Sequence, residues 1–100
     1  MKHLLVHINK SFENRVRLGV MSILMVNDWV DFTFLKETLD LTDGNLASHL
    51  AALEKSEYIQ VRKSFVGKKP NTTYAATVAG RKAFQEHLEA LEALIRSNQG

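Results

Sequence analysis

The chain has 100 residues, a formal net charge of +2, 45% hydrophobic residues and no cysteine. This length and composition predict a single globular domain over residues 1–100 with one modest core. The lack of cysteine excludes disulfides, thiolate metal ligands and thiol redox chemistry. No run of about 18 apolar residues occurs, and the N-terminus lacks the apolar stretch of a secretory signal. We therefore expect no membrane segment and a cytoplasmic location, which the lack of cysteine also fits.

Charge is distributed unevenly along the chain. From Glu54 to Lys82 there are seven lysines and arginines against two glutamates, whereas residues 31–53 hold one lysine against four acids. A local basic segment is the usual electrostatic footprint of a protein that binds a polyanion. The alternative is an ordinary solvated surface, and the charge cluster alone does not decide between the two.

The first half of the chain predicts two helices separated by a short extended stretch. Apolar residues at helical spacing predict a helix over 14–27, and the extended stretch that follows carries Trp29 as an aromatic core anchor. Thr33 is a candidate N-cap for a short second helix over 33–40. The apolar positions of the first helix are Val16, Val20, Ile23 and Leu24.

A third helix is predicted over 43–56, with Thr42 as its N-cap. Leu41 and Leu46 have the spacing of a hydrophobic staple around that cap, and Leu46 begins an apolar stripe. Only a few residues separate this helix from the one before it, as in a helix-turn-helix. The opposite face is suited to close docking because its residues are mostly small: Gly44, Asn45, Ser48, Ala51, Ala52 and Lys55.

A β-hairpin is predicted next, joining a strand over about 58–66 to one over 72–77. Apolar and polar residues alternate in the first strand, while Gly67 and the Pro70-Asn71 pair supply turn chemistry. The hairpin coincides with the basic segment. Its basic residues are Arg62 and Lys63 in the first strand and Lys68 and Lys69 at the tip.

Thr77 is a candidate N-cap for a last helix over 78–97. Such a helix is roughly 30 Å long at 1.5 Å per residue. A domain of this size has a radius of gyration of about 13 Å, so we expect the helix to overhang its own core and to present a dimerisation seam. The alternative is that the seam folds back against the first helix. The seam residues are Phe84, Leu88, Leu91 and Ile95.

The predicted order of helices and strands resembles the MarR-like winged-helix family of small bacterial and archaeal DNA-binding regulators. The resemblance rests on residues 17–18, 41–50, 63–74 and 77–81. It implies an α+β, mainly α, winged helix-turn-helix with a β-hairpin wing and a long C-terminal helix. Residues 43–55 would form the recognition helix in the major groove of double-stranded DNA, and the wing would lie on phosphates and an adjacent minor groove.

The resemblance also implies roles for individual residues. The recognition-helix candidates are Thr42, Asn45, Ser48, His49 and Lys55. The wing candidates are Arg62, Lys63, Lys68, Lys69 and Asn71. The homodimer contacts would come from Phe84, Leu88, Leu91, Leu94 and Ile95.

Two features depart from the family pattern. Glu57 stands where the family tends to have a glycine, which would close the preceding helix in a left-handed conformation without steric cost. The docking face has only one basic residue, Lys55, so base reading would depend on Asn45, Ser48 and His49. The strong contact of arginine with guanine would be missing.

The leading functional hypothesis is a dimeric transcriptional regulator that binds DNA in a sequence-dependent manner. The alternative is a winged helix used as a protein–protein interaction or assembly module without specific DNA binding. No phosphate-binding loop, metal-ligand spacing or catalytic motif occurs, so we expect no enzyme activity, no metal and no cofactor. The sequence indicates no effector and no operator.

Overall fold

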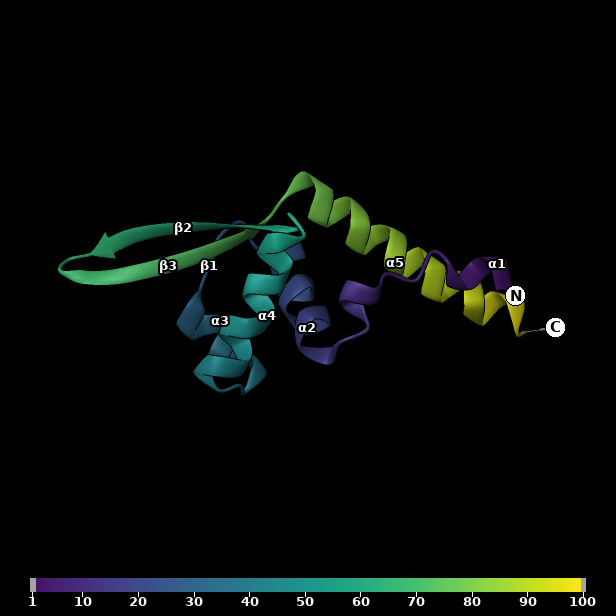
Figure 1. The fold of residues 1–100 in the computed structure, drawn as a ribbon, viewed down its shortest axis with the longest axis horizontal. Helices are drawn as coiled ribbons and strands as arrows, with labels where there is room; N and C mark the ends of the chain where they lie inside the picture. Colours follow the sequence, from purple (N-terminus) through teal and green to yellow (C-terminus); the bar gives the residue numbers. More distant parts are fainter. Residues whose placement is uncertain (1, 100) are drawn as a thin grey trace.

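The structure, a computed structural model, describes residues 2–99, and Figure 1 shows a helical body from which a long hairpin and a long helix project in opposite directions. The mainly helical α+β class, with a hairpin wing and a long last helix, is confirmed. The elements in chain order are α1 (Lys2–Leu5), η1 (Lys10–Phe12), α2 (Arg15–Met25), β1 (Val30–Asp31), α3 (Phe32–Leu39), α4 (Asp43–Lys55), β2 (Ile59–Val66), β3 (Lys69–Ala76) and α5 (Val78–Ser97).

Side-chain caps fix where the helices begin. The Asn14 carboxamide accepts from the first backbone N–H groups of α2, and the hydroxyls of Thr42 and Thr77 do the same for α4 and α5. The prediction that Thr33 caps the second helix is wrong. Asp31 is the N-cap of α3 and accepts from the N–H of Phe34, because its backbone is extended through the pairing of β1 with β3.

The three strands form an antiparallel sheet in the order β1-β3-β2. The hairpin turn contains only Gly67 and Lys68, and the positive φ of 64° at Gly67 explains the need for glycine there. The prediction that Pro70 and Asn71 belong to the turn is wrong. Pro70 pairs with Phe65 inside β3, on the stretch that β1 does not reach, so its missing N–H costs no ladder hydrogen bond.

The core lies where α2, α3, α4 and the base of the sheet meet. Its buried side chains include the predicted stripe of α4 and, in α2, Val16, Val20 and Leu24, whereas the predicted Ile23 is only partly buried. The core also contains Phe12 of η1, which was not predicted. Trp29 is not the core anchor that the sequence suggested, because its side chain is 36% exposed and only its neighbour Val30 is buried. The largest fully buried side chains are Phe12, Val20, Met21, Leu24, Leu35, Leu46 and Leu53.

Helix α5 extends beyond the body, as predicted. The molecule measures 59 × 25 × 21 Å and has a radius of gyration of 15.3 Å, above the roughly 13 Å of a compact chain of this length. The alternative, in which the seam folds back onto α2, is not observed. Phe84 instead packs against Phe12 at 5.2 Å between ring centroids, and α1 packs against α5 farther along (Figure 1).

Glu57 closes α4 with a φ of 64°, the left-handed conformation for which the family pattern has a glycine. A Cβ atom destabilises this conformation by about 1–2 kcal/mol, which glycine avoids at the cost of a more flexible unfolded chain. We expect Glu57→Gly to raise the free energy of unfolding by about 1 kcal/mol, measured by urea denaturation. The neighbouring Ser56 has a φ of −77°, so Ser56→Gly should lower stability instead. Equal effects of the two substitutions would contradict this explanation.

Candidate nucleic-acid interface

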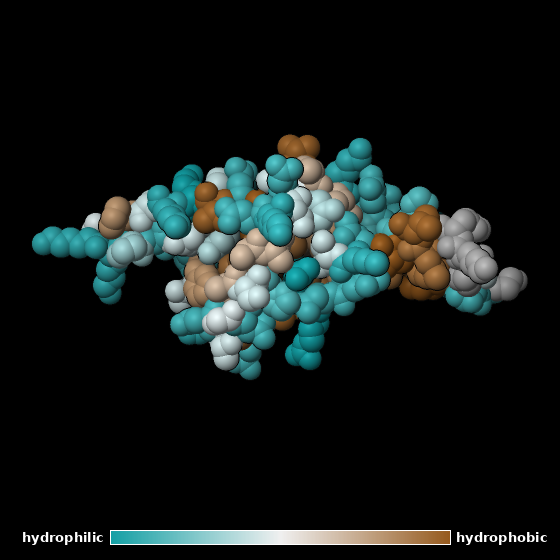
Figure 2. Space-filling view, in the orientation of Figure 1, coloured by the Kyte–Doolittle hydropathy of each residue, from teal (hydrophilic) through white to brown (hydrophobic). Residues whose placement is uncertain are grey.

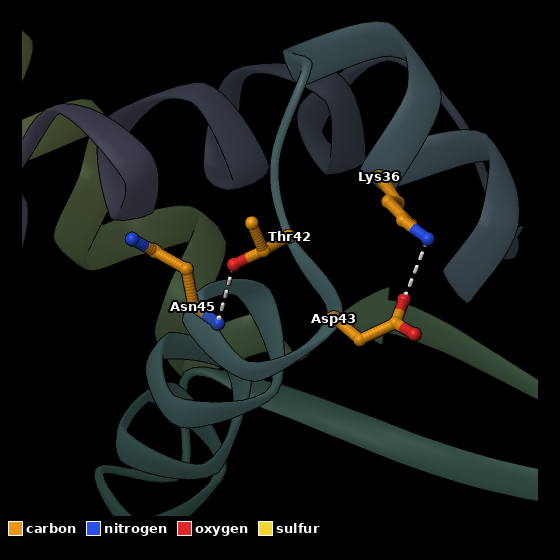
Figure 3. Close-up of polar contacts among 4 residues, drawn as sticks. All are labelled: Lys36, Thr42, Asp43 and Asn45. Carbon is orange, nitrogen blue, oxygen red and sulfur yellow. Dashed lines mark hydrogen bonds and ion pairs between the residues drawn. The ribbon is translucent and has the colours of Figure 1, made fainter.

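The N-terminus of α4 is held in place by two polar contacts (Figure 3). The Thr42 hydroxyl accepts from the backbone N–H of Asn45 at 3.2 Å, and the Asn45 side chain points away from α4. Lys36 of α3 forms an ion pair with Asp43 at 2.9 Å, across the turn that joins the two helices. Both partners are largely exposed, so this pair contributes less than about 1 kcal/mol. The cap therefore does more than the ion pair to position α4.

Helix α4 presents one side to the core and one to solvent. Leu46, Leu50 and Leu53 are buried, whereas the predicted contact residues Thr42, Asn45, Ser48 and Lys55 are exposed. His49 is half-buried beside α2. With Gly44 and two alanines between the polar side chains, the exposed side is shallow enough for close approach to another surface.

His49 has a partner that the sequence did not predict. The Nε–H of Arg17, in the first turn of α2, donates to Nδ1 of His49 at 3.0 Å. Burial lowers the pKa of His49, and the positive charge of Arg17 lowers it further. Both effects favour the neutral imidazole, and a neutral ring that accepts at Nδ1 carries its hydrogen on Nε2. The contact places an arginine beside the exposed side of α4, where the sequence alone indicated none.

The wing candidates divide between the two faces of the hairpin. Side chains alternate along each strand, and directly paired residues share a face. The register therefore puts Arg62, Lys69 and Asn71 on one face and Lys63 on the other, with Lys68 in the turn. All are exposed except Asn71, which is half-buried. A hairpin that is basic on both faces and at its tip can approach phosphates from several directions.

Arg62 is held at the base of the wing by an aromatic side chain. Its guanidinium lies 4.1 Å from the centroid of the Trp29 ring, within the range of a cation–π interaction. Trp29 comes just before β1, so the pairing of β1 with β3 brings it to this place. Sequence reasoning assigned Trp29 to the core and missed this contact, since no local pattern links residues 29 and 62.

One basic residue of the 54–82 segment is already engaged within the chain. Arg81 donates to the carbonyl oxygens of Met25 and Leu24 at 3.1 and 3.3 Å, at the C-terminus of α2. A cation at this position satisfies orphan carbonyls and interacts favourably with the helix dipole. Arg81 therefore joins α5 to the body, while the charges of the wing remain exposed.

The predicted dimer residues occupy the projecting part of α5. Leu88, Leu91 and Ile95 are 40%, 37% and 61% exposed, and Leu94 is half-buried. Phe84 is 4% exposed and belongs to the core of its own chain, so we remove it from the proposed contact. Apolar side chains gather at this end in Figure 2, and exposed Leu5 and Val6 add to the apolar surface of the chain.

The base of this projection is a polar joint within the chain. The backbone N–H of Asn9 donates to Nδ1 of buried His87 at 3.1 Å, and the Asn9 side chain donates to the Tyr58 hydroxyl at 3.0 Å. Burial lowers the pKa of His87, while nearby Glu13 acts in the opposite direction. A neutral His87 can accept this hydrogen bond, which fixes the segment before α2 against α5.

Within residues 2–99 there is no cluster of three or more histidine, aspartate or glutamate side chains that could hold a metal ion. No helix in the same part of the chain is long and apolar enough to cross a membrane.

Comparison with known proteins identifies the family. Residues 16–95 match the winged helix DNA-binding domain family, and the chain belongs to this family. An uncharacterized protein of Methanocaldococcus jannaschii, MJ0432, is 35% identical over 79 residues, which cover 79% of this chain and 86% of that protein. The winged-helix fold that the resemblance to MarR-like regulators implied is confirmed.

Two solved structures illustrate the likeness. A transcriptional regulator homologue from Pyrococcus horikoshii superposes with a TM-score of 0.88 and 30% identity, and the match covers 100% of both chains. A MarR-like transcription regulator from Bacillus cereus superposes with a TM-score of 0.70, covering 97% of this chain and 72% of the other. At 17% identity the second likeness shows the fold alone.

Proposed function

We propose that this protein is a dimeric transcriptional regulator that binds double-stranded DNA in a sequence-dependent manner. Helix α4 enters the major groove, and the β2–β3 wing lies on phosphates and the adjacent minor groove. The observation that carries the proposal is the exposed basic hairpin, with Arg62, Lys63, Lys68 and Lys69 accessible, next to the shallow capped helix. The relative from Pyrococcus horikoshii, a transcriptional regulator homologue, supports the same function.

Dimerisation follows from the projecting end of α5. A second copy that covers Leu91 and Ile95 would bring two α4 helices to one DNA molecule. In helix-turn-helix dimers the two recognition helices lie about one turn of DNA, roughly 34 Å, apart. The preferred site is then nearly palindromic, with half-sites at that spacing.

The wing lysines provide the first test. Lys68→Ala combined with Lys69→Ala should weaken binding to every duplex by a similar factor, because phosphates carry no sequence information. The salt dependence of the binding constant should also become flatter, by a slope of about one to two for each wing, since each neutralised phosphate contributes about 0.9. Fluorescence anisotropy on specific and random duplexes at several salt concentrations measures both effects.

The matched control is Lys10→Ala with Arg96→Ala, which removes the same charge from η1 and from the last turn of α5. This control should leave the salt slope nearly unchanged.

Asn45→Ala with Ser48→Ala should weaken binding to the preferred site only, by about 1–3 kcal/mol, because these side chains face base edges. If removing the wing lysines changes the affinity for no duplex at low salt, DNA binding through this wing is refuted. The protein-interaction alternative would then be favoured.

A further inference from the structure

The contact between Arg17 and His49 has a chemical consequence for the side of His49 that faces away from Arg17. A neutral imidazole has one donor and one acceptor nitrogen, and Nδ1 is the acceptor because it receives the Arg17 Nε–H. Nε2 therefore carries the hydrogen. No buried polar side-chain atom in the described part of the chain lacks a partner, and His49 Nε2 makes no hydrogen bond to a described group. Nε2 is thus open to solvent on α4.

Arg17 also changes the character of that donor. A guanidinium bound to one ring nitrogen polarises the imidazole and strengthens the opposite N–H as a donor. The pair carries one positive charge, located on Arg17, and leaves one imidazole hydrogen, on Nε2, without a partner among the described groups. A site of this kind fits an electronegative acceptor and rejects a base edge that presents an amino group.

We propose that Arg17 and His49 act as a base-reading unit, in which Arg17 keeps the hydrogen of His49 on Nε2 and His49 donates it to N7 of a guanine in the major groove. Guanine is the best match because its major-groove edge presents two acceptors, N7 and O6, whereas adenine places an amino group beside N7 and cytosine presents a donor. The proposal rests on the proposed function. It assigns His49 a reading role and makes Arg17 a positioning residue.

The first measurement uses the free protein and does not depend on DNA. Nitrogen-15 spectra of the histidine side chains distinguish the Nε2–H tautomer from the Nδ1–H tautomer, and the His49 signals are assigned by their loss in His49→Gln. We expect the Nε2–H tautomer in the wild type and a mixture of tautomers in Arg17→Lys, which keeps the charge but loses the Nε–H. A wild-type spectrum with the hydrogen on Nδ1 overturns the proposal.

The second measurement replaces each guanine of the selected site in turn by 7-deazaguanine, which removes N7 and leaves base pairing intact. At one guanine in each half-site, wild-type affinity should fall about fivefold, the size of one net hydrogen bond. His49→Asn keeps an acceptor for Arg17 but lacks the distal donor, so it should lose this dependence. His49→Gln, whose amide nitrogen lies near the position of Nε2, should retain part of it.

The outcomes separate this proposal from the proposed function. A site without guanine under α4, or equal affinity for normal and 7-deaza duplexes, overturns the reading unit while salt-dependent DNA binding stands. Loss of fold in His49→Asn, measured by circular dichroism, would mean that His49 is a packing residue and would also overturn the proposal. If the wild type binds no duplex at all, both proposals fail, even where the tautomer is as expected.

Discussion

Gly80→Ala is expected to lower the free energy of unfolding by at least about 3 kcal/mol, which is a large part of the 5–15 kcal/mol typical of a domain. A Cβ atom on Gly80 would lie 1.9 Å from the carbonyl oxygen of Tyr58 and 2.8 Å from its carbonyl carbon. These are backbone atoms, so no side-chain rotation can relieve the overlap. Urea denaturation monitored by circular dichroism measures the effect.

The Tyr58 peptide cannot withdraw without breaking the joint between the hairpin and α5. Its carbonyl oxygen accepts from the N–H of Thr77 at 3.0 Å, and the Thr77 hydroxyl donates to the carbonyl of Glu57 at 2.7 Å. The same hydroxyl also caps α5 by accepting from the N–H of Gly80. The left-handed residue that ends α4, the base of the wing and the start of α5 therefore meet at one point.

Gly44→Ala is the matched control for Gly80→Ala. A Cβ at Gly44, in the first turn of α4, would meet nothing within 4 Å. The substitution should raise stability by roughly 0.5–1 kcal/mol, because alanine favours the helix. If Gly80→Ala were as well tolerated as Gly44→Ala, the close packing of α5 against the start of β2 would be incorrect.

Much of the fold could be predicted because its signals are local. Helices α4 and α5 begin where Thr42 and Thr77 indicated, since a capping side chain and the N–H that it satisfies are only three residues apart. The apolar stripes at helical spacing and the alternation in β2 likewise compare near neighbours in sequence. The departure at Glu57 was also visible, and the structure gives it a positive φ.

The errors lie where a distant partner decides the structure. Asp31 rather than Thr33 caps α3 because β1 pairs with Thr73 and Tyr74 of β3, more than 40 positions later. Pro70 and Asn71 have turn chemistry, yet the two-residue turn at Gly67 and Lys68 sets a register that extends β3 to include them. Pro70 is acceptable there only because β1 is too short to reach it.

In the candidate site, too, features set by neighbours in sequence could be predicted, whereas contacts with distant residues could not. Exposure of Asn45, Ser48 and the wing lysines follows from periodicity, which the sequence displays. The contacts of Arg17 with His49 and of Trp29 with Arg62 each join residues more than 30 positions apart. No spacing rule predicts such pairs from one sequence. They are also the contacts that determine how the polar side chains of the site are oriented.

The proposed dimer requires a surface that the chain leaves uncovered, and the end of α5 provides one. Phe84, His87 and Ala90 form a buried line that faces the chain's own N-terminal segment. Three large apolar residues in the projecting half of α5 stay exposed, namely Leu88, Leu91 and Ile95. A seam of this spacing on a projecting helix is suited to pack against its own copy.

Leu91→Gln combined with Ile95→Gln is expected to convert the proposed dimer into a folded monomer. Both side chains are exposed in the single chain, so the domain itself loses little buried apolar area. Light scattering should report half the mass. Affinity for a two-half-site duplex should fall by about 10²–10⁴, since the second recognition helix no longer binds at high effective concentration.

Val78→Gln is the matched control, because Val78 is an apolar residue of the same helix that is 86% exposed at its opposite end. It should leave both the mass and the affinity unchanged. A short duplex with one half-site gives a second control, since the monomeric variant should bind it nearly as tightly as one subunit of the wild type. An unchanged mass for the Leu91 and Ile95 variant would place the dimer contact elsewhere. Reduced mass with full affinity would mean that one wing and one α4 helix suffice to bind DNA.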